Sequence, residues 1–174
     1  MVDLQYPIGK FQPQESYSNA EQDDAISRIA SLPSRLRNAV ANLSPTQLDT
    51  PYRDGGWTVR QVIHHVADSH MNAYIRVKWA ITEDSPLIKA YDEKAWAGTP
   101  EASDSVELSL NLLEPLHKKW ATLLKGLSGA DRKKYFIHPE TKKQVTIERQ
   151  MALYAWHGDH HLAHITGLKT RMGW

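Results

Sequence analysis

WTVRQVIHHVADSHMNAYIRVKWAITED, residues 57–84, contains neither proline nor glycine. Its apolar residues Val59, Val62, Ile63 and Val66 recur at the spacing of one helix face, and the same stripe continues through Ala73 and Val77. A periodic segment of this length predicts one long amphipathic helix. The apolar face of this helix must be covered by other segments of the chain.

Three further segments have helical spacing. Residues 18–43 begin with an N-cap candidate, Ser18, and contain Pro33 as a bending point; residues 104–127 contain Pro115; residues 147–170 form the last helix. Four long helices predict an all-α protein, a four-helix bundle forming a single domain over residues 1–174.

The connecting segments have their own signals. Residues 1–16 are too rich in proline and glycine for a helix and predict an extended arm lying on the domain. The long loop 85–103 carries Tyr91 and Trp96, which makes it a candidate lid or pocket wall. Residues 135–138 and 144–147 predict two short strands, a small β-hairpin before the last helix.

The composition excludes several classes of protein. The chain has 21 Lys and Arg against 20 Asp and Glu, without a basic stripe, so nothing indicates binding to nucleic acid or to a membrane surface. No run approaches the ~18 apolar residues of a membrane span, and no signal peptide is evident. Cysteine is absent, which leaves His, Asp and Glu as metal ligands. We expect a soluble, cytoplasmic protein.

The last predicted helix concentrates the histidines. YAWHGDHHLAHITGL, residues 154–168, holds His157, His160, His161 and His164. At ~100° per residue, His161 and His164 lie within about 40° of His157 on the side of the large apolar residues, whereas Asp159 points outward and His160 lies on the flank. The inward pair with one-turn spacing is His157 and His161, but His160 and His164 share that spacing and are not excluded.

The helix at residues 57–84 supplies a third candidate. His65 borders its apolar stripe, whereas the adjacent His64 is expected to point away from the bundle. An uncommon number of polar residues shares the side of His65: Gln61, Asp68, Ser69, Asn72 and Arg76. Burial of such groups is costly unless they meet partners or line a wet cavity. We therefore expect His65 to lie in a polar strip of this helix and to face another helix of the bundle.

Two imidazoles one turn apart, joined by a third from another helix, suit a divalent ion and leave positions open to water or substrate. The plainer interpretation is that a helical histidine is an ordinary core or surface side chain. For His70, His117 and His138 we adopt that interpretation. Asp68 could orient a ligand imidazole or act as a general base, although an Asp on a helix is more often merely solvated.

The sequence also resembles a known family, the YfiT-type proteins of the DinB superfamily, in the order and spacing of several segments along the whole chain. These segments are YPIG (6–9), TPYRDGGWTVRQVIHHVADSHMN (50–72), YDEKAW (91–96), HPETK (138–142), YAWHGDHHLAHIT (154–166) and RMGW (171–174). The resemblance implies a four-helix bundle with one divalent metal ion, commonly nickel or zinc, bound by three histidines. It also implies cytoplasmic proteins that tend to form homodimers and are named metal-dependent hydrolases.

The family's ligand positions can be carried over to this sequence. The ligand on the second helix falls on the second histidine of HHVADSH, His65, and the motif His-x-x-His-His places ligands at His157 and His161. One departure is LAHIT, residues 162–166, where many superfamily members have an Arg-Gly-Gln run. This departure argues against transferring a substrate from distant members.

From these observations we predict a metal-dependent hydrolase acting on a small-molecule substrate. His65, His157 and His161 would hold the ion, a bound water would be the nucleophile, and Asp68 or His164 would assist proton transfer. The alternative enzyme is an S-transferase of the bacillithiol-transferase type that uses a low-molecular-weight thiol. A third hypothesis is a non-enzymatic metal-binding protein, which predicts a closed shell of four protein ligands.

Overall fold

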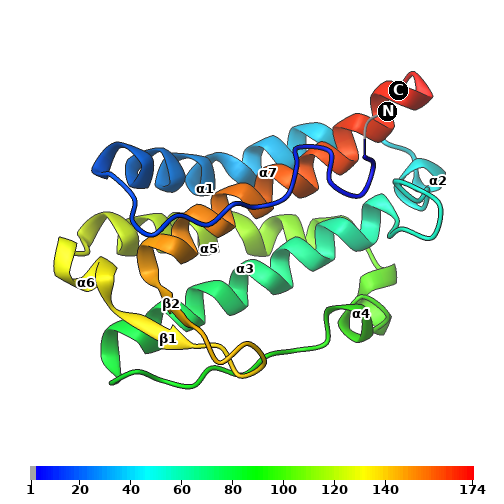
Figure 1. The fold of residues 1–174 in the computed structure, drawn as a ribbon. Helices are drawn as coiled ribbons and strands as arrows, with labels where there is room; N and C mark the ends of the chain where they lie inside the picture. The colour runs from blue at the N-terminus through cyan, green and yellow to red at the C-terminus, as the bar shows by residue number, and fades with distance from the viewer. Residues whose placement is uncertain (1–2) are drawn as a thin grey trace.

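Four long helices form the body of the molecule, a computed structural model that describes residues 3–174 (Figure 1). They are α1 (Asn19–Val40), α3 (Val59–Thr82), α5 (Val106–Gly126) and α7 (Ile147–Met172). α1 packs against α5 and α7, and α3 packs against the same two helices. The predicted four-helix bundle is therefore confirmed.

Polar side chains fix where these helices begin. The hydroxyls of Ser18, Thr58, Ser105 and Thr146 accept backbone N–H groups of the first turns of α1, α3, α5 and α7, respectively. This satisfies donors that have no partner within a helix. The prolines predicted to bend the helices, Pro33 and Pro115, lie inside α1 and α5 without interrupting either element.

The order in which the chain visits the helices is visible in the colours of Figure 1. α1 and α7 run in one direction, and α3 and α5 run in the other. α5 can run parallel to α3 only because the connection between them returns along the full length of the bundle. That connection contains the short helix α4 (Glu93–Trp96) and the 3₁₀ helix η1 (Pro100–Ser103). The prediction that this connection is a plain loop is therefore wrong at both short helices.

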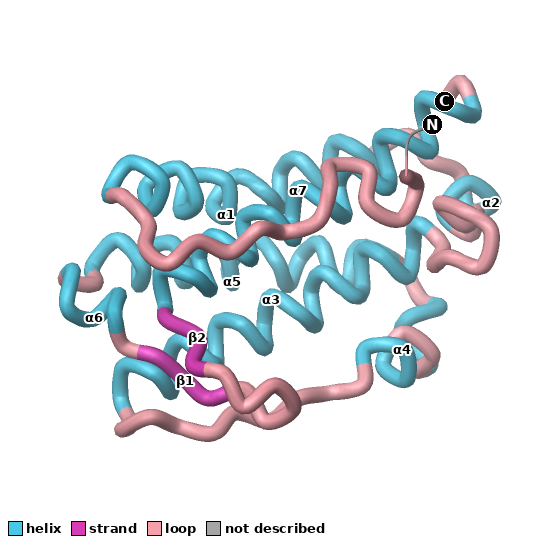
Figure 2. The backbone as a smooth tube through the Cα atoms, viewed as in Figure 1, coloured by secondary structure: helices cyan, strands magenta, loops and turns pink. Residues whose placement is uncertain are grey.

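Smaller elements close the two ends of the bundle. α2 (Pro45–Leu48) joins α1 to α3, and α6 (Gly129–Lys133) follows α5. The predicted hairpin is confirmed as β1 (Tyr135–Ile137) and β2 (Gln144–Thr146), shown in Figure 2. The two strands are antiparallel, and Phe136 pairs with Val145. β1 also pairs with the α3–α5 connection through the bridge between Leu87 and Ile137. The hairpin thereby ties this connection to the bundle.

The N-terminal arm has no helix or strand from residue 3 to residue 17 and lies along α7 (Figure 1), as predicted. The indole N–H of Trp156 donates to the backbone oxygen of Gly9, and Phe11 packs against the same indole. Farther towards the N-terminus, the backbone oxygen of Gln5 lies 3.2 Å from Nε2 of His164. The arm therefore covers the histidine-bearing stretch of α7.

The core consists of two apolar clusters. One gathers around Trp120 and includes Ile26, Val77 and Met151; the other gathers around Leu36, Val62 and Ile165. Buried polar residues lie between these clusters along α3 and α7: His65, Ser69, His70, His160, His161 and His164. A polar layer thus crosses the middle of the bundle, and this layer positions the candidate site.

Candidate metal centre

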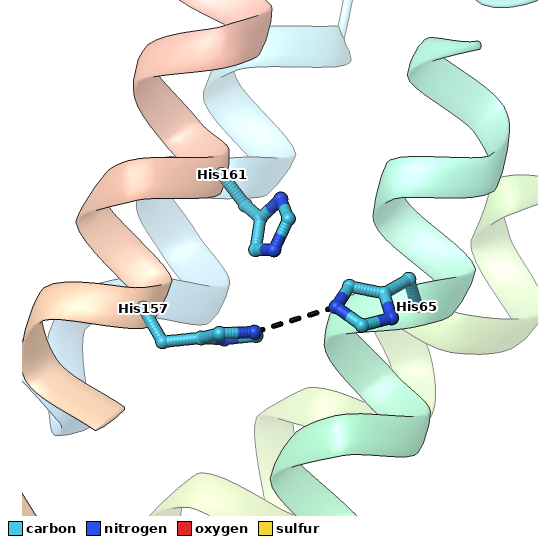
Figure 3. Close-up of side chains that lie close together, drawn as sticks. All are labelled: His65, His157 and His161. Atoms are coloured by element: carbon cyan, nitrogen blue, oxygen red, sulfur yellow. Dashed lines mark hydrogen bonds between the residues drawn. The ribbon is translucent and has the colours of Figure 1, made fainter. Parts of the chain in front are cut away.

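Three imidazoles from two helices converge in the polar layer (Figure 3). His65 comes from α3, and His157 and His161 come from successive turns of α7. One ring nitrogen of each residue lies within 4.8 Å of the other two, and Nε2 of His65 is 3.3 Å from Nε2 of His157. The structure therefore brings together the three histidines expected as ligands.

The rotational setting of α7 follows from its contacts with α1. Gly158 faces Leu32, and a Cβ atom at this position would lie 2.5 Å from Leu32 Cδ2. Asp159 pairs with Arg28, at 2.6 Å, and with Arg35. The prediction that Asp159 points outward is wrong, because α1 packs along this side of α7. Together these contacts turn His157 and His161 towards α3.

The electrostatic environment keeps the three rings neutral. Burial lowers the pKa of His65 from 6.5 to about 4, with a smaller effect from positive charge at His160 and His164. Loss of hydration likewise holds the pKa values of His157 and His161 well below 6.5. Neutral imidazoles offer lone pairs without proton competition near pH 7. The donor set therefore fits a divalent ion of borderline softness.

A second imidazole lies behind His161. Nε2 of His164 is 3.2 Å from the backbone oxygen of Gln5, which can only accept, so this nitrogen carries the proton. Nδ1 of the neutral His164 ring is then an acceptor, and it lies 3.4 Å from Nδ1 of His161. His161 must therefore be protonated at Nδ1, which leaves the lone pair of its Nε2 free.

His157 also has an imidazole behind it. Nε2 of His70 lies 3.1 Å from Nδ1 of His157. The His70 ring stacks on His117 with centroids 4.9 Å apart, and Nδ1 of His117 donates to the backbone oxygen of Ile29 at 2.6 Å. His70 and His117 are therefore not the ordinary core or surface side chains expected from the sequence. His70 lies about 140° from His65 around α3, and only the packing of α5 onto α3 brings His117 near.

The prediction for His64 is wrong. Instead of pointing away from the bundle, its side chain is buried, with Nδ1 2.8 Å from the hydroxyl of Ser109 and Nε2 3.3 Å from the backbone oxygen of Asp104. The start of α5 covers this side of α3, so α3 has two buried faces. His64 nevertheless faces away from the three converging imidazoles.

The alternative pair on α7 also lies in the polar layer. His160 is buried, stacks on Trp156 and contacts Tyr6 of the arm. One ring nitrogen each of His160, His161 and His164 lies within 4.8 Å of the other two. The two groups share His161. The N-terminal arm therefore covers His160, which the sequence had placed on the flank of the inward face.

Asp68 follows His65 by three positions on α3. Among residues 3–174 its carboxylate forms no hydrogen bond with a histidine, and only its backbone oxygen has a side-chain partner, Asn72. Partial burial, aided by the negative charge of Glu101, raises the pKa of Asp68 to about 6. An orienting role for Asp68 therefore has no hydrogen bond to support it, whereas its raised pKa suits proton transfer near neutral pH.

A cavity of about 670 Å³ opens beside His157. Its lining combines parts of α3 and α7, residues 90–94 of the α3–α5 connection and the hairpin turn. The lining residues are Ser69, Arg76, Ala90, Tyr91, Asp92, Glu93, Lys94, His138, Glu140, Leu153, Tyr154 and His157. Of the two aromatic residues that made the 85–103 segment a candidate pocket wall, Tyr91 lines the cavity and Trp96 does not. His157 connects the cavity to the converging imidazoles.

Comparisons with known proteins agree with this architecture. The chain is 50% identical over 174 residues to "Putative metal-dependent hydrolase YfiT" of Bacillus subtilis, covering 99% of this chain and 98% of that protein. It is 53% identical over 169 residues to "Putative metal-dependent hydrolase OB0782" of Oceanobacillus iheyensis, with 97% and 98% of the two chains covered.

Solved structures show the same fold. The structure of YfiT from Bacillus subtilis, described as a "probable metal-dependent hydrolase with an unusual four-helix bundle topology", has a TM-score of 0.97 at 50% identity and 99% coverage of both chains. TT2238, a four-helix bundle protein, has a TM-score of 0.58 at 18% identity, covering 84% of this chain and 98% of its own, and supports the fold alone. The family model described as the DinB superfamily matches residues 28–165. The chain therefore belongs to the DinB superfamily.

Proposed function

We propose that this chain is a hydrolase that depends on one divalent ion, zinc or nickel, held by His65, His157 and His161. The observation that carries the proposal is the convergence of three neutral imidazoles beside a cavity, with His157 belonging to both. The names of the related proteins agree with a metal-dependent hydrolase. When bound, such an ion lowers the pKa of a coordinated water and polarises a carbonyl group.

The chain's own residues supply the remaining tasks. His70 and His164 orient His157 and His161, so that Nε2 of each faces the converging group. Ser69, Tyr91 and Tyr154 present hydroxyls on the cavity wall for hydrogen bonds to a small-molecule substrate. Asp68, with its pKa raised to about 6, is the better candidate for moving a proton, because both ring nitrogens of His164 already have partners.

The first experiment measures ligand identity. His65→Ala, His157→Ala and His161→Ala should each remove most of the zinc or nickel bound per chain, measured by elemental analysis after dialysis. His64→Ala is the matched control, because His64 is equally buried on the same helix but faces Ser109. Full metal content in the His161 variant would overturn this ligand set.

The second experiment measures the reaction. The metal-loaded protein is incubated with ester and amide panels, and in parallel with the electrophile monochlorobimane with and without low-molecular-weight thiols. We expect hydrolysis that needs metal, needs no thiol and is lost in the His157 variant but kept in the His64 variant. Metal-dependent turnover that requires a thiol would replace the hydrolase assignment by the S-transferase.

A further inference from the structure

Arg76 is a buried cation without an acidic partner. Only 9% of the residue is exposed, and its Nη2 donates to the backbone oxygen of Lys89 at 3.2 Å. Its Nε is buried and has no hydrogen-bond partner within residues 3–174, and no carboxylate of this part of the chain forms an ion pair with it. A guanidinium keeps its charge at any physiological pH, so this arrangement is costly unless a ligand completes it.

The unpaired guanidinium belongs to the cavity that reaches His157. Arg76 follows His65 by eleven positions on α3, which separates their Cα atoms by about 16 Å along the helix axis. Helical side chains lean towards the N-terminus of their helix, so the guanidinium of Arg76 shortens this distance. Ser69, Tyr91 and Tyr154 line the cavity between the two ends. A molecule several bonds long can therefore touch both Arg76 and the histidine end.

None of the acidic residues of the cavity forms an ion pair with Arg76, although the charge of Glu93 reaches Tyr91 and Tyr154 as that of Arg76 does. Asp92, Glu93 and Glu140 are all exposed, so they lie on the solvent side of the cavity. Asp92 is also engaged in capping α4, because its Oδ1 accepts the backbone N–H groups of Lys94 and Ala95. The buried end of the cavity thus holds a cation that has no ion-pair partner, whereas the rim carries charges of both signs.

We propose that the cavity binds small molecules that carry a carboxylate, and that Arg76 holds this carboxylate while the rest of the molecule extends towards His157. The planar fork of a guanidinium matches the two oxygens of a carboxylate. That the distal end of the molecule is the reacting end rests on the proposed hydrolase function. Recognition of the carboxylate by Arg76 does not rest on that function, because it needs no metal and no reaction.

The binding test therefore uses the metal-free protein. Glutarate and the uncharged glutaramide are titrated by calorimetry or NMR into the wild type, Arg76→Gln and Lys94→Gln. Glutamine keeps a polar side chain without the charge, and Lys94 is the control because it is a cation on the exposed rim. We expect the wild type and Lys94→Gln to bind glutarate at least tenfold more tightly than glutaramide, and Arg76→Gln to lose this preference.

Several results would overturn the anion site. These are equal binding of glutarate and glutaramide by the wild type, an unchanged preference in Arg76→Gln, or an equal loss in Lys94→Gln. Tighter binding of inorganic phosphate than of glutarate would overturn the choice of carboxylate. If Arg76→Gln does not fold, Arg76→Lys replaces it and must keep the preference for glutarate with weaker binding, because lysine keeps the charge but lacks the fork.

A paired activity test separates this inference from the hydrolase proposal. The metal-loaded protein is assayed with mono-4-nitrophenyl glutarate and with neutral 4-nitrophenyl butyrate. We expect kcat/KM to favour the anionic ester at least tenfold in the wild type but not in Arg76→Gln. If neither ester is hydrolysed while glutarate binding still depends on Arg76, the hydrolase proposal fails and the carboxylate site stands.

Discussion

At the scale of single residues, the tautomers of the proposed ligands depend on groups that would not themselves touch the ion. If Nε2 of His157 faces the ion, its Nδ1 carries the proton and donates to Nε2 of His70. Nδ1 of His70 is then a donor, and it has no partner among residues 3–174. Nε2 of His117 is an acceptor, because Nδ1 of the same ring donates to Ile29, and it also has no partner among residues 3–174.

We expect His70→Phe to weaken zinc binding by about tenfold to a hundredfold, because the phenyl ring fills the space but cannot accept the proton of His157. His70→Gln should retain more of the affinity, because a side-chain carbonyl can accept that proton. Competition with a chromophoric chelator measures both variants. Equal affinities for the wild type and His70→Phe would show that the 3.1 Å contact has no orienting role.

At the scale of helices, Gly158 sets how closely α7 approaches α1. We expect Gly158→Ala to lower the free energy of unfolding by about 1 to 3 kcal/mol, because the added methyl would overlap the buried side chain of Leu32. Denaturant unfolding followed by circular dichroism measures the change. The metal content should also fall, since moving α7 displaces the adjacent His157.

Gly167 is the matched control on the same helix. A Cβ atom there would lie 3.5 Å from Arg171 Nη1 and meet nothing else, so Gly167→Ala should be neutral or stabilise by up to about 1 kcal/mol through helix propensity. In a Leu32→Ala background, Gly158→Ala should lose most of its cost. A cost that persists there would show that Leu32 is not the obstacle.

The sequence was most informative where one helix alone determines the outcome. Periodicity and caps predicted the four long helices within a few residues, and spacing on α7 selected His157 and His161 as the inward pair. Predictions were wrong or missing for residues whose surroundings depend on a second helix. His64 is buried because α5 covers it, Asp159 is paired because α1 lies beside it, and His70 meets His157 across an interface that a helical wheel does not contain.

At the scale of the whole molecule, the two apolar clusters on either side of the polar layer should hold the fold without a bound ion. We expect chelation to leave the helical circular dichroism signal largely intact and to lower the melting temperature by a few degrees, as loss of a ligand that binds only the native state requires. An unfolded metal-free protein at room temperature would favour a structural role for the ion.

Acid should destabilise the metal-free protein over a defined pH range. The pKa values of His65, His117 and His164 are lowered to about 4, chiefly by burial, from 6.5. Between these values the unfolded chain binds more protons than the native state, so stability falls as pH decreases from about 6.5 to about 4. Asp68, with its pKa raised to about 6, acts in the opposite direction but is a single group.

Urea midpoints at pH 7.5, 6, 5 and 4.5 measure this dependence in the presence of a chelator. His117→Gln should flatten the curve, because it removes one buried titrating ring while leaving the three converging histidines in place. A midpoint that is independent of pH between 7.5 and 4.5 would contradict neutral burial of these rings.

The position of the arm on α7 has a consequence for the order of events during protein synthesis. Gln5 and His65 both leave the ribosome before α7, so each must wait for α7 before its partner exists. A nascent chain that has reached only α5 offers a metal a single one of the three converging imidazoles. Ion capture and closure of the arm are therefore late events, completed when α7 docks between α1 and α3.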